Sequence, residues 1–224
     1  GLCLVGSEMC IRDSYLHMKS LLLSLTAVLA LAFAPVQAQD LAIGETAPMV
    51  DAPLINIDGS NLTMNGLKKD NGLLVIFSCN TCPCVVGNGN KTEGWEGRYN
   101  GLADMAEAKS IGMVLVNSNE AKRTGDDSFS EMKNHARNAG YTVPYVVDRG
   151  SKLANNFGAR TTPHVYLFDA EMTLVYCGSI DDNVNSSSEV NERYLEDAIG
   201  RLAAGKKIKT AETKAVGCSI KRLR

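Results

Sequence analysis

Short apolar runs and helix-like repeats alternate along most of the chain. Residues 73–77 and 112–117 are almost wholly apolar and rich in β-branched side chains, as expected for strands buried on both faces of a sheet. Between them, apolar residues recur at helical spacing over residues 95–106, and a later helix is predicted after Ser128, which forms a capping box with Glu131. This alternation is typical of layered α/β folds.

The remaining strands are predicted to form hairpins at the edges of the sheet. An Asp-Gly-Ser turn separates two short runs before residue 73, and a second hairpin follows residue 163. The further strands are predicted at residues 54–57, 62–64, 143–147, 164–169 and 173–177. A last amphipathic helix over residues 190–202 ends near Gly205. We expect an α/β fold with a central mixed sheet, helices on both faces and an N-terminal β-hairpin extension.

The first residues of the chain differ from the rest. Residues 1–17 resemble a translated sequencing-library adapter, so we expect them to be a non-native extension. An apolar run at residues 21–34 precedes the small-residue sequence Val36-Gln37-Ala38. Residues 18–38 are therefore predicted to be a secretory signal peptide, which implies export to a bacterial periplasm and a mature chain from Gln39. Because the run is shorter than the roughly 20 residues of a membrane span, we expect no stable membrane insertion after cleavage.

All the predicted strands and helices lie within residues 39–205, which have the size of one domain. The formal net charge of the whole chain is −2 and it has no basic block, which argues against nucleic-acid binding. Residues 206–224 form a basic tail, yet its segment at residues 215–220 is apolar. Because such a segment near a terminus normally persists only if it docks, we expect the tail to pack on the domain.

The cysteines suggest the chemistry. Cys79 and Cys82 form a C-x-x-C pair directly after the strand at residues 73–77, and Pro83 suits the first turn of a helix. The partial positive charge at a helix N-terminus stabilises a thiolate and lowers its pKa. We expect Cys79 to be the exposed nucleophile of lower pKa and Cys82 to be the buried resolving thiol.

A proline directly before a predicted strand is the second feature of interest. The Thr162–Pro163 bond precedes residues 164–169, and an X–Pro bond at such a position can be cis at little cost. Together with the C-x-x-C pair, this resembles the thioredoxin superfamily, in which a cis-proline loop faces the cysteines. The resemblance implies that Thr162 and Pro163 present backbone groups to the substrate.

Longer segments resemble exported thioredoxin-like redoxin proteins, which are related to the alkyl hydroperoxide reductase and thiol-specific antioxidant family. These segments are residues 44–48, 58–59, 77–83, 162–163, 178–183 and 213–221. The resemblance implies a thioredoxin-like fold and thiol–disulfide exchange at Cys79 and Cys82, with protein disulfides or dithiols as substrates, an unidentified redox partner, and neither a metal nor another cofactor. The chain departs from thioredoxin in having Ser78 before the first cysteine and no acidic residue just after Cys82.

Two other functions remain open from the sequence. A peroxiredoxin needs Thr three positions before its peroxidatic cysteine, and if Cys82 filled that role, Cys79 would replace the Thr; Arg160 could still polarise a peroxide. A copper chaperone of this fold could bind Cu(I), because thiolates are soft ligands. Its candidate ligands are Cys79, Cys82, Cys84 and His164.

The docking expected for the tail makes its cysteine a further candidate. Cys218 would serve as a third redox thiol if it approaches Cys79 or Cys82 closely enough for a disulfide, which requires Cα atoms within about 7 Å.

Overall fold

The central strand of the sheet is β3 (Gly72–Ser78), whose residues are all buried. Its side chains alternate between the two faces, as the pleat of a strand requires. Leu74 and Ile76 pack into one apolar cluster, and Leu73 and Val75 into another on the opposite face. The continuous apolar run therefore forms a strand that is covered on both faces, as predicted.

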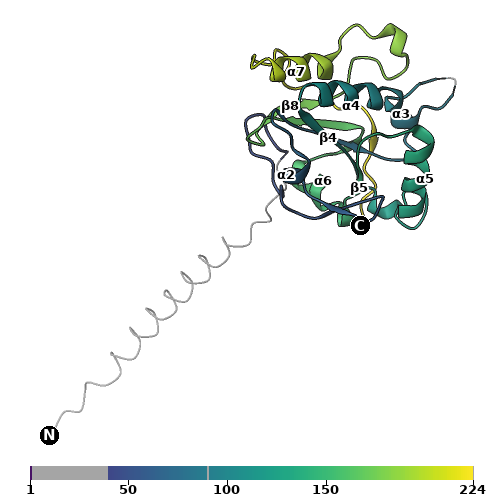
Figure 1. Ribbon diagram of the computed structural model, residues 1–224. Helices are drawn as coiled ribbons and strands as arrows, with labels where there is room; N and C mark the ends of the chain where they lie inside the picture. The colour runs from purple at the N-terminus through teal and green to yellow at the C-terminus, as the bar shows by residue number, and fades with distance from the viewer. Residues whose placement is uncertain (2–39, 90, 224) are drawn as a thin grey trace. The chain divides into compact units, whose positions relative to one another are not determined.

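In the computed structural model, which describes residue 1 and residues 40–89 and 91–223, seven strands form one mixed sheet (Figure 1). Their order is β2-β1-β5-β4-β3-β7-β8. The strands beside β3 are β1 (Leu54–Asn56), β2 (Asn61–Leu62), β4 (Ile111–Asn117), β5 (Tyr145–Val147), β7 (His164–Phe168) and β8 (Leu174–Gly178). β3, β4 and β5 are parallel, whereas the β1–β2 and β7–β8 hairpins join the sheet antiparallel. The mixed sheet and the N-terminal hairpin are thus confirmed.

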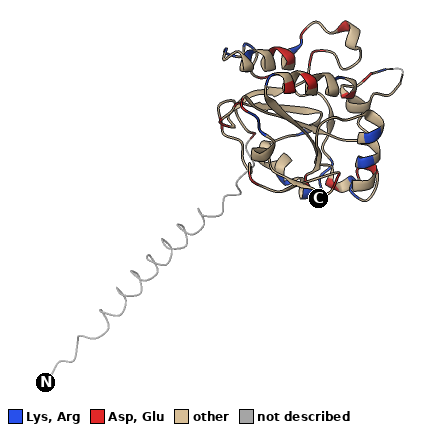
Figure 2. Cartoon of the chain, in the orientation of Figure 1, with Lys and Arg blue, Asp and Glu red and all other residues tan. Residues whose placement is uncertain are grey.

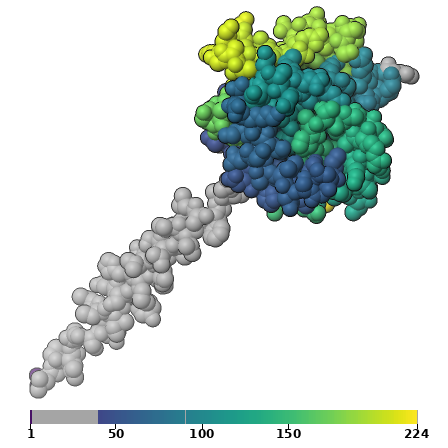
Figure 3. Space-filling model, viewed as in Figure 1, coloured from purple at the N-terminus to yellow at the C-terminus, as the bar shows by residue number. Residues whose placement is uncertain are grey.

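Helices cover both faces of this sheet. They are α2 (Met64–Leu67), α3 (Pro83–Val86), α4 (Tyr99–Ala108), α5 (Phe129–Ala139), α6 (Lys152–Phe157) and α7 (Tyr194–Ala203). Short 3-10 turns occur at η2 (Glu96–Arg98), η3 (Glu120–Lys122), η4 (Arg149–Ser151) and η5 (Ser187–Glu189). Buried residues of α4, α5 and α7 belong to the cluster around Leu74, and those of α2 and α6 to the cluster around Leu73. α7 lies against α4, on the outside of the domain (Figure 3).

The charged residues are also divided between the layers of the fold. β3 and β4 contain no charged residue, whereas Lys, Arg, Asp and Glu are distributed over the helices and loops (Figure 2). Within residues 40–89 and 91–223, none of the helices combines the length and the apolar character needed to cross a membrane. The predicted adapter-derived residues 2–17 and the predicted signal peptide at residues 18–38 lie outside the described residues.

The tail continues from the domain and adds backbone pairs to it. The carbonyl oxygen of Ala211 accepts a hydrogen bond from the backbone N–H of Cys177 at 2.9 Å, next to an isolated parallel bridge with β8. Further on, β9 (Cys218–Ser219) pairs antiparallel with β6 (Thr161–Thr162). Ile220 is 5% exposed and belongs to the apolar core. The tail thereby reaches the proline loop beside the cysteines.

Candidate active site

The two thiols of the C-x-x-C pair lie where β3 ends and α3 begins. Cys79 directly follows β3, and Cys82 is the N-cap residue of α3, with Pro83 at the first helical position. The carbonyl oxygen of Cys82 accepts hydrogen bonds from the backbone N–H groups of Val85 and Val86, at 2.7 and 2.9 Å. Cys82 is therefore the thiol at the helix N-terminus, and Cys79 precedes it in the connecting loop.

Both thiols are buried, which corrects the expectation that Cys79 is exposed. Their exposed fractions are 1% for Cys79 and 4% for Cys82. Thr162 contacts both of them: its Oγ1 lies 3.2 Å from Sγ of Cys79, and its carbonyl oxygen lies 3.1 Å from Sγ of Cys82. Thr162 of the proline loop and Cys218 of the tail strand lie against this junction and contribute to the burial.

The pKa values of the two thiols move in opposite directions. The hydrogen bond between them is the largest cause: it lowers the pKa of Cys82 to about 5 and raises the pKa of Cys79, which burial and the negative charge of Asp127 raise further. The thiol and backbone N–H of Cys218 and the backbone N–H of Cys84 also stabilise the Cys82 thiolate. The prediction that Cys79 has the lower pKa is wrong, because Cys79 donates the hydrogen bond that stabilises the Cys82 thiolate.

Asp127 is a functional candidate that the sequence reasoning misses. It is fully buried and accepts hydrogen bonds from the backbone N–H of Asn80 at 3.0 Å and from the side-chain amides of Asn117 and Asn119, at 2.7 and 2.9 Å. These bonds attach the C-x-x-C loop to the end of β4. In sequence, Asp127 is simply one of two adjacent acids before the Ser128 cap, so no local signal distinguishes it from a turn residue.

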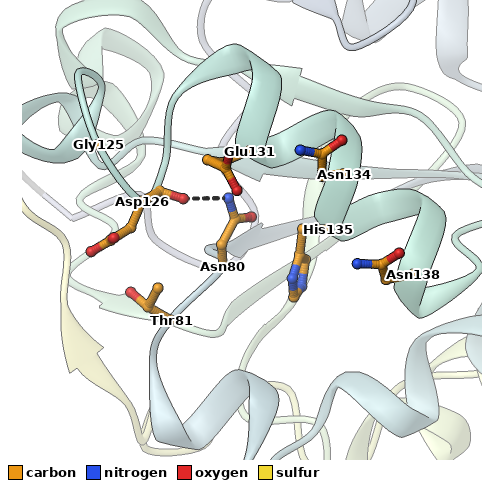
Figure 4. A pocket seen from close by; sticks show the side chains of 8 residues that line it. All are labelled: Asn80, Thr81, Gly125, Asp126, Glu131, Asn134, His135 and Asn138. Atoms are coloured by element: carbon orange, nitrogen blue, oxygen red, sulfur yellow. Dashed lines mark hydrogen bonds between the residues drawn. The ribbon is translucent and has the colours of Figure 1, made fainter.

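A polar pocket of about 270 Å³ opens beside the residues between the two cysteines. Asn80 and Thr81 lie on one side of it, and the side chains of α5 project from the other (Figure 4). The Asn80 amide donates to the carbonyl oxygen of Asp126 at 2.7 Å, and its Oδ1 accepts from the Tyr145 hydroxyl at 2.9 Å. The remaining lining residues are Gly125, Glu131, Asn134, His135 and Asn138. The loop thus carries a fixed polar surface next to the buried pair.

The Thr162–Pro163 peptide bond is cis, as predicted. The strand edge that precedes the proline is already occupied, because Cys218 of the tail stands opposite Thr162 in the β6–β9 pair. The backbone N–H of Ile220 then donates to the carbonyl oxygen of Arg160 at 2.9 Å. A Cβ atom on Gly217 would lie 2.3 Å from the Thr162 carbonyl oxygen, so the tail approaches the loop this closely only with glycine at this position.

Cys218 lies at the redox pair. The Sγ atoms of Cys82, Cys84 and Cys218 all lie within 4.8 Å of one another. Burial raises the pKa of Cys84, and it raises the pKa of Cys218 to about 12. Of the three thiols, Cys82 is thus the one that ionises readily.

Arg160 and His164 belong to a different pocket from the three thiols. The Arg160 side chain is 74% exposed and forms an ion pair with Asp40, so it is not positioned to polarise a peroxide at Cys82. Nε2 of His164 lies 3.4 Å from Sγ of Cys177, and burial lowers the pKa of the imidazole to about 4. The structure therefore does not assemble the copper ligand set that the sequence suggested.

Comparison with known proteins agrees with this architecture. The Redoxin family model matches residues 42–194. An uncharacterized conserved protein from Geobacillus kaustophilus is 29% identical, with 84% of this chain and 96% of that chain covered and a TM-score of 0.72. A hypothetical protein from Sinorhizobium meliloti 1021 is 27% identical, with coverages of 84% and 98% and a TM-score of 0.72.

A peroxidoxin, BcpB, from Mycobacterium tuberculosis shares the fold at 15% identity, with 73% of this chain and 97% of that chain covered and a TM-score of 0.52. No curated protein matches the chain. The family match and the thiol pair at the junction of β3 and α3 support thiol-based redox activity. The chain belongs to the Redoxin family and has a thioredoxin-like fold.

Proposed function

We propose that this protein is an exported thiol–disulfide oxidoreductase with Cys79 and Cys82 as its redox pair. The observation that carries the proposal is the position of two contacting thiols at the junction of β3 and α3, where the hydrogen bond from Cys79 lowers the pKa of Cys82. The thiolate is the species that attacks a disulfide, and a second thiol in contact with it can resolve the mixed disulfide. Cys82 is therefore the nucleophile in this proposal, and Cys79 is the resolving thiol.

The exchange with a substrate disulfide then has two steps. The Cys82 thiolate attacks one substrate sulfur, which forms a mixed disulfide and releases the other substrate sulfur as a thiolate. That thiolate takes the proton of Cys79, and the Cys79 sulfur attacks Cys82, which closes the protein disulfide and releases the second substrate thiolate. The two electrons of the pair leave with the substrate sulfurs, and a reducing dithiol partner must restore Cys79 and Cys82.

Access to the pair determines which substrates can react. Both thiols are at most 4% exposed, and β9 occupies the backbone edge at Thr162. A protein disulfide that binds beside Thr162 and Pro163 must therefore displace the tail strand and take over its pairing. Extended substrate segments fit this arrangement, because strand addition uses backbone hydrogen bonds that do not depend on sequence.

Cys218 provides a second route between the buried pair and the solvent, and we propose it as the third redox thiol. It is half-buried and lies within 4.8 Å of Cys82, sulfur to sulfur. After oxidation, attack of the Cys218 sulfur on the Cys82 sulfur would form a Cys82–Cys218 disulfide and release the Cys79 sulfur, which takes up the proton that Cys218 loses, with no net change in electrons. Mass mapping of partly oxidised protein carrying Cys84→Ser and Cys177→Ser tests this route. A Cys82–Cys218 link is expected, and its absence would leave a two-cysteine enzyme.

Peroxide reduction is the second candidate function, because a thiolate at a helix N-terminus also suits a peroxidatic cysteine. Two observations favour exchange. Cys79, not Thr, stands three positions before Cys82, and the Arg160 guanidinium is paired with Asp40 in a separate pocket.

Insulin reduction by dithiothreitol and peroxide consumption with a thiol donor should be measured side by side. We expect insulin reduction that is lost in Cys79→Ser and in Cys82→Ser and retained in Cys177→Ser, whose thiol lies in another pocket. Rapid peroxide turnover that survives Cys79→Ser, without insulin reduction, would identify a peroxidase instead.

A further inference from the structure

One thiol beside the redox pair has no part in the exchange. Cys84 lies in α3, and its Sγ lies within 4.8 Å of the Sγ atoms of Cys82 and Cys218. Exchange at Cys79 and Cys82 does not require a thiol at residue 84. We propose that the reduced thiols of Cys82, Cys84 and Cys218 form a three-coordinate site for Cu(I).

The spacing of the sulfur atoms suits such a site. Metal–sulfur bonds of about 2.3 Å put the sulfur atoms of a planar three-coordinate site about 4.0 Å apart. The three Sγ atoms lie within 4.8 Å of one another. Side-chain rotations that move the sulfur atoms by about 1 Å or less would therefore bring them to this spacing. Cys79 contacts Cys82 and Oγ1 of Thr162, but it does not belong to the set of thiols that all lie within 4.8 Å of one another.

The backbone holds all three ligands before any metal binds. Cys82 and Cys84 flank Pro83 at the start of α3, where the proline fixes one backbone angle. Cys218 comes from β9, which is held by pairing with Thr162 and by the close approach of Gly217. A preformed set loses little conformational entropy when the ion binds, which favours affinity.

The chemistry of the donors selects the ion. Three thiolates without a carboxylate are soft ligands, which suit Cu(I) and do not suit Mg²⁺ or Ca²⁺. A structural Zn²⁺ site has four ligands, and the cluster supplies three.

Cys82 would belong both to the Cu(I) site and to the redox pair. The other ligands of the ion, Cys84 and Cys218, are not members of that pair. Bound Cu(I) therefore occupies the nucleophile, and oxidation of Cys82 removes one ligand. The ion is expected to bind only to the reduced protein. The inference depends on the thiol cluster and not on the proposed exchange activity, so either can fail without the other.

Anaerobic titration of the reduced mature chain with Cu(I), in competition with a chromophoric Cu(I) chelator, tests the site. We expect one ion per chain, with loss of binding in Cys84→Ser and in Cys218→Ser. Binding should persist in Cys79→Ser and in the matched control Cys177→Ser. X-ray absorption of the loaded protein should show three sulfur ligands at about 2.3 Å.

The same variants show how the inference would be overturned. Binding that is lost in Cys79→Ser but kept in Cys84→Ser and Cys218→Ser would mean that the C-x-x-C pair alone holds the ion. Failure of the folded, reduced wild-type chain to compete with the chelator would exclude the site, as would binding of Zn²⁺ in preference to Cu(I). Circular dichroism of each variant would show that any loss of binding does not come from unfolding.

Discussion

At the scale of single residues, the chemistry depends on the contact between two buried thiols. Cys79 donates to the Cys82 thiolate, and this hydrogen bond is the largest cause of the lowered pKa of Cys82. Replacing Cys79 by Ala removes the donor and should raise the pKa of Cys82, whereas Cys79→Ser keeps a hydroxyl donor and should raise it less. Alkylation of Cys82 against pH, followed by mass spectrometry, measures both shifts.

The pH profile of the wild type follows from the same contact. With a pKa of about 5, Cys82 is ionised at neutral pH, so its alkylation rate should level off well below pH 8.5. A free thiol, with a pKa near 8.5, would still gain reactivity through that range. An unchanged Cys82 profile in Cys79→Ala would assign the low pKa to the N-terminus of α3 rather than to Cys79.

Asp127 is the residue for which we predict combined effects on stability and reactivity. Asp127→Asn replaces one acceptor oxygen by an amide that opposes the Asn119 donor, so it should destabilise the fold by about 1–3 kcal/mol. Loss of the negative charge should also lower the pKa of Cys79, which Asp127 raises. Urea unfolding and thiol titration measure the two effects. The exposed neighbour Asp126 is the control, and Asp126→Asn should change neither quantity.

At the scale of secondary structure, local signals predicted the elements that carry the C-x-x-C pair. The apolar run before Cys79 and Pro83 after Cys82 fix a strand-to-helix junction within a dozen residues. The burial of both thiols was not predictable, because it depends on Thr162 and on the pairing of β6 with β9, which lies more than 130 residues away in sequence. Such a pairing leaves no periodic pattern at the cysteines.

The β6–β9 pair gives a prediction about the tail strand. Gly217→Ala would put a Cβ atom 2.3 Å from the Thr162 carbonyl oxygen, so β9 should shift away from β6. We expect Cys218 to react several-fold faster with a maleimide and the fold to lose stability. Gly101→Ala is the matched control, because a Cβ atom at this position of α4 meets nothing within 4 Å. Equal labelling rates in the two variants would mean that the tail strand does not restrict access to Cys218.

At the scale of the whole molecule, the layers of the fold were predictable from the sequence. The contacts between segments that are distant in sequence were not. Alternating strands and helices indicated a mixed sheet with two covered faces, and the structure has this arrangement. The contacts that complete the molecule join distant segments. Asp40 pairs with Arg160, and the backbone N–H of Leu41 donates to Phe157 at 3.2 Å, so the start of the expected mature chain lies against α6.

This contact bears on the proposed export. Cleavage after Ala38 would keep Asp40 and Leu41, and with them the contacts to Arg160 and α6. When the chain begun at Met18 is produced in a bacterium with two membranes, we expect periplasmic protein whose N-terminus is Gln39 and whose melting temperature equals that of a chain begun at residue 39. Deletion of residues 21–34 is the control and should keep the protein in the cytoplasm, because the apolar segment is what a secretory signal requires. Membrane-bound protein that retains Met18 would show that the segment is an anchor rather than a cleaved signal.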